Sequence, residues 1–289
     1  MAERAQAGSK VLAALREVHD GRFSRHNDGR RVSWEGRVSV LAAVTEAIDE
    51  LGMGPFGERF LSYRIPHLSA DGDLAAGRFA LRGSRASRSE VRELATEFLS
   101  RIRIPEEVPD LSYGDIGILA LLGTFVTPTR SAVMWDSRHD GVADVPQPER
   151  SPRLLRGLGQ LLRAFRVMGV SETGAWRVVR QVALGSIRTR KRRTLSPLLQ
   201  SELPMVAGSV AGRAQLSETG ARRDLAEFAA FHIVERIGDH PTTWRIAHWF
   251  REMWIDVVAI TGAVDLVTLR EPVPERGEPT QQAFGDPAR

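Results

Sequence analysis

Residues 204 to 247 read PMVAGSVAGRAQLSETGARRDLAEFAAFHIVERIGDHPTTWRIA, and this stretch decides the fold that we predict for the chain. Small apolar residues recur at helical spacing up to Leu216, which predicts a first helix. Ser217 is suited to cap a second helix, along which apolar residues recur at i, i+3 and i+4. Two strand-like runs, 233–237 and 243–246, flank a tip rich in turn-forming residues and predict a β-hairpin. Helix, capped turn, helix and hairpin in this order predict a winged helix-turn-helix.

The outward side of the second predicted helix has hydroxyl and guanidinium groups, which suit contact with phosphates and base edges in a DNA major groove. We therefore expect duplex DNA as a partner. The alternative is a protein-docking module whose arginines are simply solvated. The residues predicted to contact DNA are Ser217, Thr219, Arg222 and Arg223 on the helix, and His240, Thr242 and Thr243 in the wing.

A basic cluster, RTRKRR at residues 188–193, directly precedes this module. Such a cluster predicts a salt-sensitive phosphate-binding segment, and the alternative is a solvated linker. Its residues predicted to meet DNA phosphates are Arg188, Arg190, Lys191, Arg192 and Arg193. The net charge of the whole chain, +4, is modest, so the local cluster is the stronger evidence.

Composition limits the class of protein. The chain has 289 residues, of which 42% are hydrophobic and 26% charged, which fits a protein with two globular domains. No apolar run reaches the roughly 20 residues of a membrane-spanning helix. The first residues lack the order of a signal peptide, and the sequence has no cysteine. We therefore expect a cytoplasmic protein with no membrane partner.

The N-terminal region predicts a small α/β unit. An amphipathic helix is expected over residues 9–20, and a polar, turn-rich segment follows it. A β-branched run at 37–44 predicts a buried strand that ends at Thr45, and residues 58–66 predict a second strand. The glycine loop between them, residues 52–57, satisfies G-x-G-x-x-G, but a strand rather than a helix follows it, so we reject a dinucleotide site.

The order of helix, strand, glycine loop and second strand resembles the second half of an AAA+ ATPase core. The likeness is to helicase-like and sigma-54-activator-like branches and to ATPases of actinobacterial phages or mobile elements. It implies that Thr45 is sensor 1 and that Arg59 is an arginine finger, with Arg64 as a less favoured substitute. Residues 145–168 and 170–187 are similar to the lid helices of that family, and Arg153 then stands at sensor 2.

The resemblance, which covers roughly residues 9 to 190, lacks the family's nucleotide site. There is no G-x-x-x-x-G-K-[ST] loop and no apolar strand that ends in Asp-Glu. We therefore expect no ATPase activity from this chain alone and no cofactor, with ATP and Mg²⁺ relevant only if a partner chain completes the site. The alternatives are a split ATPase subunit that supplies Thr45, Arg59 and Arg153 in trans, and a degenerate fragment with only its winged helix competent. Those three residues are otherwise expected to make local or surface contacts.

Other chemistry has little support in the sequence. The seven histidines never occur at metal-binding spacing, so no metal site is expected. The aspartates in 135–144 lack the pattern of a calcium loop and indicate a turn. Helices are expected over 91–104 and 112–130, the latter stopped at Pro128. A last helix over 248–260 is expected to pack on the winged helix or, alternatively, to pair with a second copy in a homo-oligomer.

Together these features predict a mostly α protein with short β segments. The expected parts are a partial AAA+-like core at 1–70, a helical lid-like region at 71–190, a winged helix with its C-terminal helix at 191–262, and a disordered tail at 263–289. The expected function is DNA binding, in transcription regulation or in a mobile element.

Overall fold

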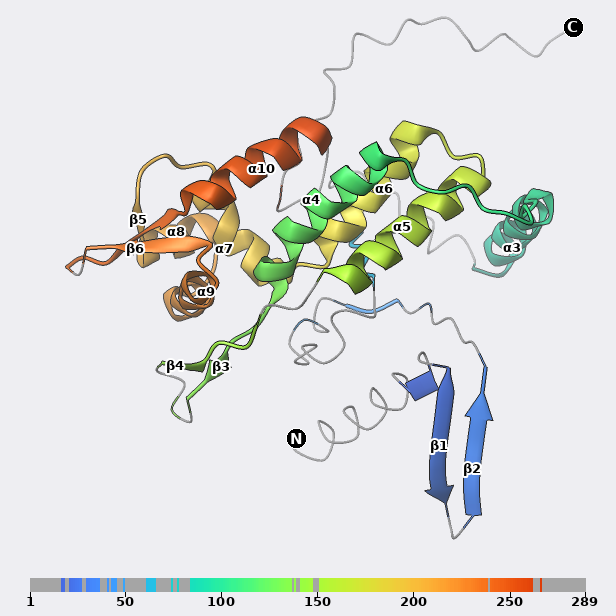
Figure 1. Cartoon of the computed structure of the whole chain (residues 1–289), viewed down its shortest axis with the longest axis horizontal. Helices are drawn as coiled ribbons and strands as arrows, with labels where there is room; N and C mark the ends of the chain where they lie inside the picture. Colours follow the sequence, from blue (N-terminus) through green and yellow to red (C-terminus); the bar gives the residue numbers. More distant parts are fainter. Residues whose placement is uncertain are drawn as a thin grey trace, which may run out of the picture.

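The computed structural model is mostly helical, with short antiparallel strands in small sheets (Figure 1). It describes residues 17–18, 21–27, 30–36, 41, 43–45, 49, 61–65, 74, 77, 84–136, 138, 141–147, 151–238, 240–261 and 266. Most of the predicted helix over 9–20 and, except for Leu266, the predicted tail lie outside these residues. Leu266 is buried, so the prediction of disorder is wrong at that position.

The helices are α3 (Ser84–Arg101), α4 (Tyr113–Arg130), α5 (Pro152–Val167), α6 (Glu172–Gly185), α7 (Thr189–Leu199), α8 (Ala207–Ala214), α9 (Glu218–Ala230) and α10 (His248–Thr261). The strands are β1 (Arg22–Asn27), β2 (Arg30–Glu35), β3 (Met134–Trp135), β4 (Val142–Asp144), β5 (Met205–Val206), β6 (Val234–Ile237) and β7 (Thr243–Ile246).

Helices α4, α5, α6 and α10 pack together and form one part of the hydrophobic core. Leucines at 154, 158 and 162 place one apolar stripe of α5 against α4 and α6, as expected for a helix with apolar residues every three or four positions. Phe125 of α4 stacks on Phe250 of α10, with ring centroids 4.8 Å apart, and lies 5.3 Å from the ring of Trp254. At Gly123 a side chain would meet Leu155 at 2.6 Å, so glycine permits the close approach of α4 and α5.

The ends of these helices are fixed by polar contacts. Ser112 and Asp115 form a capping box at the start of α4. Arg166, near the end of α5, donates to both oxygens of Asp115 at 2.9 and 2.8 Å. This pairing holds the pKa of Asp115 far below its usual range, although burial opposes the shift. The start of α4 is therefore tied to the end of α5.

The prediction that α4 stops at Pro128 is wrong, because the helix continues to Arg130. The hydroxyl of Thr129 donates to the carbonyls of Phe125 and Val126 at 3.1 and 2.7 Å, which adds hydrogen bonds in the turn that the proline interrupts. Phe125 and Val126 are also fully buried. Tertiary packing thus outweighs the local preference against proline.

Residues 204–247 form the predicted helices and hairpin. Ser217 caps α9 by accepting from the backbone of Gly220 at 3.1 Å, as its position predicts. The hairpin β6–β7 also pairs with the short strand β5, which the sequence did not indicate, in a three-stranded antiparallel sheet of order β5-β7-β6. Because β5 directly precedes α8, this pairing joins the start of α8 to the hairpin.

The predicted terminal helix is confirmed as α10. Its aromatic side packs on α4 of the same chain, and Phe250 and Val257 are fully buried. Packing within the chain is therefore observed for part of this helix, and Trp249, Ile255 and Ile260 remain exposed, so its pairing with a second copy stays a prediction.

The N-terminal region differs from the prediction. The polar segment after the first helix forms the antiparallel hairpin β1–β2, in which Arg22 pairs with Glu35 and Asn27 with Arg30. In the expected buried strand, the described residues 41 and 43–45 belong to no strand and are exposed. Residues 61–65, within the second expected strand, lie against helices instead, where the Gln181 side chain donates to the Arg64 carbonyl at 2.8 Å. The two strands of the AAA+-like core are therefore not formed at these positions.

Candidate nucleic-acid interface

Helix α9 has a clear inward and a clear outward side. Ala221, Leu225 and Phe228 are fully buried, whereas Thr219 and the two adjacent arginines, Arg222 and Arg223, are exposed. This division follows from 3.6 residues per turn, because the buried residues recur every three or four positions. Further along the outward side, Ala226 presents only a methyl group. A flat surface such as the floor of a groove could approach this part of the helix closely.

The two arginines on the outward side of α9 differ in their ion pairs. Arg222 pairs with Glu218 one turn earlier, at 2.6 Å between Nη2 and Oε1, and both side chains remain more than half exposed. Arg223 makes no ion pair with any residue that the structure describes. An exposed i,i+4 pair is weak, so both guanidinium groups are available to an anionic partner.

The tip of the β6–β7 hairpin is stiffened by side-chain hydrogen bonds. Thr243 donates to the carbonyl of Ile237 at 2.9 Å, and Arg236 donates to the Thr242 hydroxyl at 3.4 Å. His240 at the tip is exposed. In Figure 1 the hairpin and α9 lie at the same end of the molecule. The predicted wing residues thus lie at the same end of the molecule as α9.

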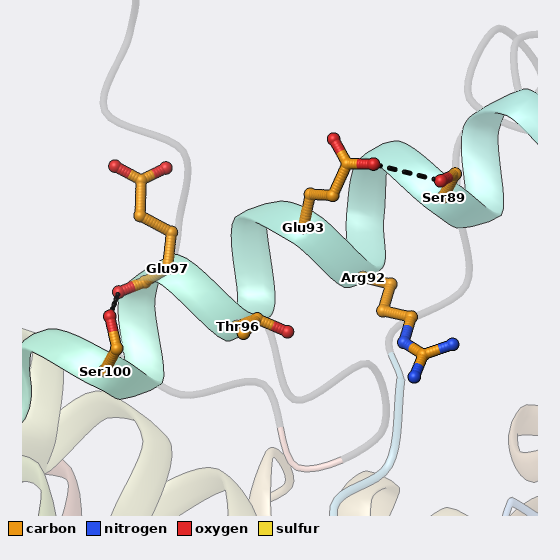
Figure 2. Close-up of a pocket in the computed structure, with 6 residues that line it drawn as sticks. All are labelled: Ser89, Arg92, Glu93, Thr96, Glu97 and Ser100. Carbon is orange, nitrogen blue, oxygen red and sulfur yellow. Dashed lines mark hydrogen bonds between the residues drawn. The ribbon is translucent and has the colours of Figure 1, made fainter.

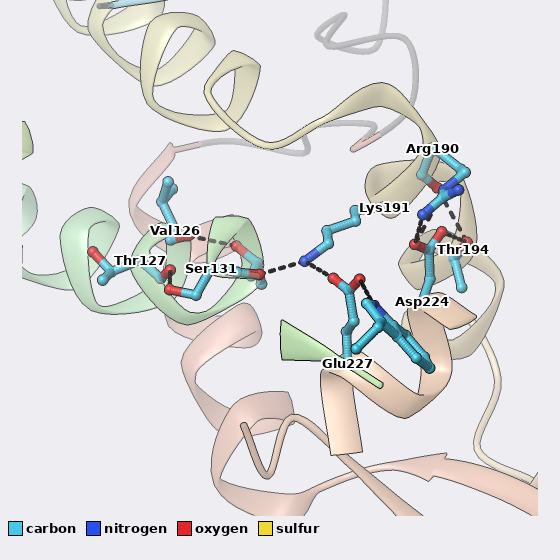
Figure 3. A network of polar contacts seen from close by, with 10 residues as sticks. Val126, Thr127, Ser131, Arg190, Lys191, Thr194, Asp224 and Glu227 are labelled. Atoms are coloured by element: carbon cyan, nitrogen blue, oxygen red, sulfur yellow. Dashed lines mark hydrogen bonds and ion pairs between the residues drawn. The ribbon is translucent and has the colours of Figure 1, made fainter. Parts of the chain in front are cut away.

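A buried polar network lies behind α9 (Figure 3). The ammonium group of Lys191, on α7, lies 2.6 Å from a carboxylate oxygen of Glu227, on α9, and it also donates to the carbonyl of Ser131 after α4. The indole of Trp135, on β3, donates to the other Glu227 oxygen at 3.2 Å. Lys191 is only 1% exposed, so burial lowers its pKa, and the charge of Glu227 opposes that shift.

A second buried acid joins the same two helices. Asp224 has no exposed surface and accepts from Arg190 at 2.7 Å and from the Thr194 hydroxyl at 2.9 Å. Burial raises the pKa of Asp224, and the charge of Arg190 and these hydrogen bonds oppose the rise. Two acids on α9 are thus fixed by two bases on α7, which sets the orientation of α9 in the fold.

As a whole, the basic cluster 188–193 is therefore neither the phosphate-binding segment nor the solvated linker that the sequence allowed. Arg188 stands at the N-cap position of α7, where its side chain makes no capping hydrogen bond, and the other residues form the first turns of the helix. For Lys191 and Arg192 the DNA prediction is wrong, because these side chains are 1% and 2% exposed and turn inward. Arg192 donates to the carbonyl of Leu266 at 3.2 Å.

Two other residues of the same cluster, Arg190 and Arg193, also have partners within the module. Arg190 binds Asp224, and Arg193 donates to the Gln215 carbonyl, in the turn before α9, at 2.8 Å. Both guanidinium groups therefore support the α8–α9 unit. Arg188 is half-buried, and its contact with DNA stays a prediction.

The structure describes only part of the set of residues expected from the ATPase resemblance. Thr45 is exposed and Arg153 is exposed on α5, whereas Arg59 lies outside the described residues. Arg64 has internal partners: its guanidinium pairs with Asp49 at 2.7 Å and donates to the Gly185 carbonyl at 2.6 Å.

The other oxygen of Asp49 accepts from the backbone of Thr189 at 3.0 Å, in the first turn of α7. Arg64 and Asp49 together cap the helix that supports α9. A helix start needs such acceptors, because its first amides have no partner within the helix.

Sequence reasoning missed Asp224 and Glu227. Both occur on the apolar side of α9, next to Leu225 and Phe228, where a charged residue is rare unless it is paired. Acids at buried helix positions shortly after a basic cluster are the signal that could have predicted the pairing.

Comparison of the chain with family models, curated proteins and solved structures finds no match. The described residues contain no group of three or more His, Asp or Glu side chains placed to hold a metal ion. Within the same residues, no helix has the length and apolar character needed to cross a membrane.

Proposed function

We propose that this chain binds duplex DNA and that residues 189 to 246 act as a winged helix. In this proposal α9 enters the major groove, and the tip of the β6–β7 hairpin contacts the backbone or the minor groove. The observation that supports it best is the exposed side of α9, with Thr219, Arg222 and Arg223, in a helix-strand-helix-helix-hairpin order. That order is typical of DNA-binding modules that insert their last helix.

The contacts behind α9 fit this role. A helix that inserts into a DNA groove must keep a fixed orientation while its side chains contact the DNA. The pairs Lys191–Glu227 and Arg190–Asp224 fix α9 on two successive turns, from the side that faces away from solvent. The outward side can then present its hydroxyl and guanidinium groups in one geometry, which lowers the entropic cost of binding.

The experiment is a fluorescence anisotropy titration of a labelled mixed-sequence duplex at several salt concentrations. The affinity should fall as salt rises, because each phosphate contact releases counterions. Changing Arg222 and Arg223 together to alanine should weaken binding by about tenfold or more, since two charged contacts are lost.

The matched control is Arg153→Ala with Arg156→Ala, which removes the same charge from two exposed positions of α5. This variant should bind DNA within about twofold of the original protein, because salt-screened charges far from the interface contribute little. Absence of binding by the original protein, or equal weakening by the two double variants, would overturn the proposal.

A further inference from the structure

Helix α3 has an apolar side that no other described part of the chain covers. Every residue from 88 to 101 is exposed, including four large apolar side chains. Their exposed fractions are 60% for Val91, 59% for Leu94, 51% for Phe98 and 63% for Leu99. Single exposed leucines are ordinary, but four on one helix form a continuous surface, and surfaces of that kind mark interaction sites.

The four side chains lie on one side because of their spacing. Val91, Leu94 and Phe98 follow the three-then-four pattern of a coiled-coil seam, and Leu99 widens the same stripe. A β-branched residue followed by leucine at the next seam position favours two parallel helices.

The opposite side of α3 is polar, and its side chains form hydrogen bonds within the helix (Figure 2). It forms a shallow groove lined by Ser89, Arg92, Glu93, Thr96, Glu97 and Ser100. Ser89 donates to Glu93 at 3.0 Å, and Ser100 donates to the carbonyl of Glu97 at 2.8 Å. In Figure 2 the carboxylates of Glu93 and Glu97 point to one side of the helix and Arg92 to the other.

The two edges of the apolar stripe have opposite charge. At 3.6 residues per turn, Glu90 and Glu97 border the stripe on one edge, and Arg88 and Arg92 border it on the other. Arg101 lies on the acidic edge, where it pairs with Glu97 and leaves that edge negative overall.

We infer that α3 pairs with α3 of a second copy of this chain, in parallel, through the stripe of Val91, Leu94, Phe98 and Leu99. In a parallel pair with two-fold symmetry, the basic edge of each helix faces the acidic edge of the other. An antiparallel pair would instead place acid against acid and base against base. The charges therefore complement a second copy in one direction only.

This pairing leaves the proposed DNA-binding surface free. In Figure 1 α3 lies at one end of the molecule and α9 at the other. The dimer would present two copies of α9 to DNA, but it forms without DNA, so its test does not depend on the proposed function.

The first test is the mass of the full chain in solution, by light scattering or sedimentation equilibrium without DNA. The original protein should be a dimer. Leu94→Glu with Phe98→Glu should raise the dissociation constant by about 100-fold or more, because two apolar contacts per copy are replaced by charges.

The matched control is Ile255→Glu, which places the same charge at an exposed apolar position of α10. This variant should stay dimeric. A monomeric original protein overturns the inference, whatever else covers the stripe, and so does a dimer that only the Ile255 substitution dissociates. Circular dichroism checks that each variant keeps its helices.

The second test is the direction of the pair, and the absence of cysteine from the sequence makes it direct. Val91→Cys and Phe98→Cys are made in separate proteins and oxidised. In a parallel pair each cysteine faces its own copy, so each protein alone forms a disulfide-linked dimer. Cross-linking only when the two variants are mixed would show an antiparallel pair and contradict the inferred geometry.

Discussion

The outward side of α9 and the basic cluster 188–193 have similar composition but opposite roles in the structure. Both contain adjacent basic residues, and both were predicted to meet DNA. On α9, Arg222 and Arg223 are exposed, whereas in the cluster Lys191 and Arg192 are buried. The two regions differ because buried acids of α9, Asp224 and Glu227, form ion pairs with Arg190 and Lys191 of the cluster.

This comparison shows what a count of basic residues leaves out. A guanidinium or ammonium group can bind phosphate only if its own chain has not already engaged it. Asp224 and Glu227 engage Arg190 and Lys191, and the Gln215 carbonyl engages Arg193. The cluster therefore orients the helix that we propose binds DNA, and contributes to binding through that orientation.

Removing the buried ammonium group of Lys191 should have the largest effect among the tests of this difference between α9 and the basic cluster. Lys191→Ala leaves Glu227 buried without its ion pair, which should lower the free energy of unfolding by about 3–5 kcal/mol. Urea denaturation followed by circular dichroism measures this change. The double variant Lys191→Met with Glu227→Leu removes both charges and should recover most of the lost stability. A loss below about 1 kcal/mol for Lys191→Ala would mean that the Lys191–Glu227 pair is solvated. The cluster would then be exposed to solvent, as the outward side of α9 is, and the account would be contradicted.

The exposed pair on α9 should behave in the opposite way. Arg222→Ala breaks an ion pair whose side chains are 69% and 52% exposed, so the free energy of unfolding should change by less than about 0.5 kcal/mol. The same urea titration measures it. A destabilisation comparable to that of Lys191→Ala would show that Arg222 has a structural role and would weaken its assignment to DNA.

The sequence was sufficient for the helices and hairpin of residues 204–247, because the information there is local. Ser217 caps its helix through contacts three residues away, and the apolar spacing of α9 states which side is buried. Strand β5 was missed because it is two residues long and exists only through its pairing with β7. The burial of Lys191 was missed for a similar reason, since it depends on Glu227, 36 residues later in the chain.

The strand predicted at 37–44 from β-branched composition is not formed at its described residues, 41, 43 and 44. A run such as 37–44 indicates a strand only if neighbouring strands pair with it, and composition says nothing of those neighbours. Leu41 and Val44 are exposed and belong to no strand, while the polar run before them forms β1 and β2. Arg64, the less favoured substitute for the arginine finger, pairs with Asp49, which accepts from the backbone at the start of α7.

The most direct test of the central claim asks which surface touches DNA. The sequence has no cysteine, so a photoactivatable cross-linker can be attached at one introduced cysteine at a time. Thr219→Cys places it on the outward side of α9, and Thr173→Cys places it at an exposed position of α6. Illumination with duplex DNA should cross-link the Thr219 variant strongly and the Thr173 variant hardly at all, and excess unlabelled duplex should compete. Cross-linking that is equal at the two sites, or found only at position 173, would contradict DNA binding through α9.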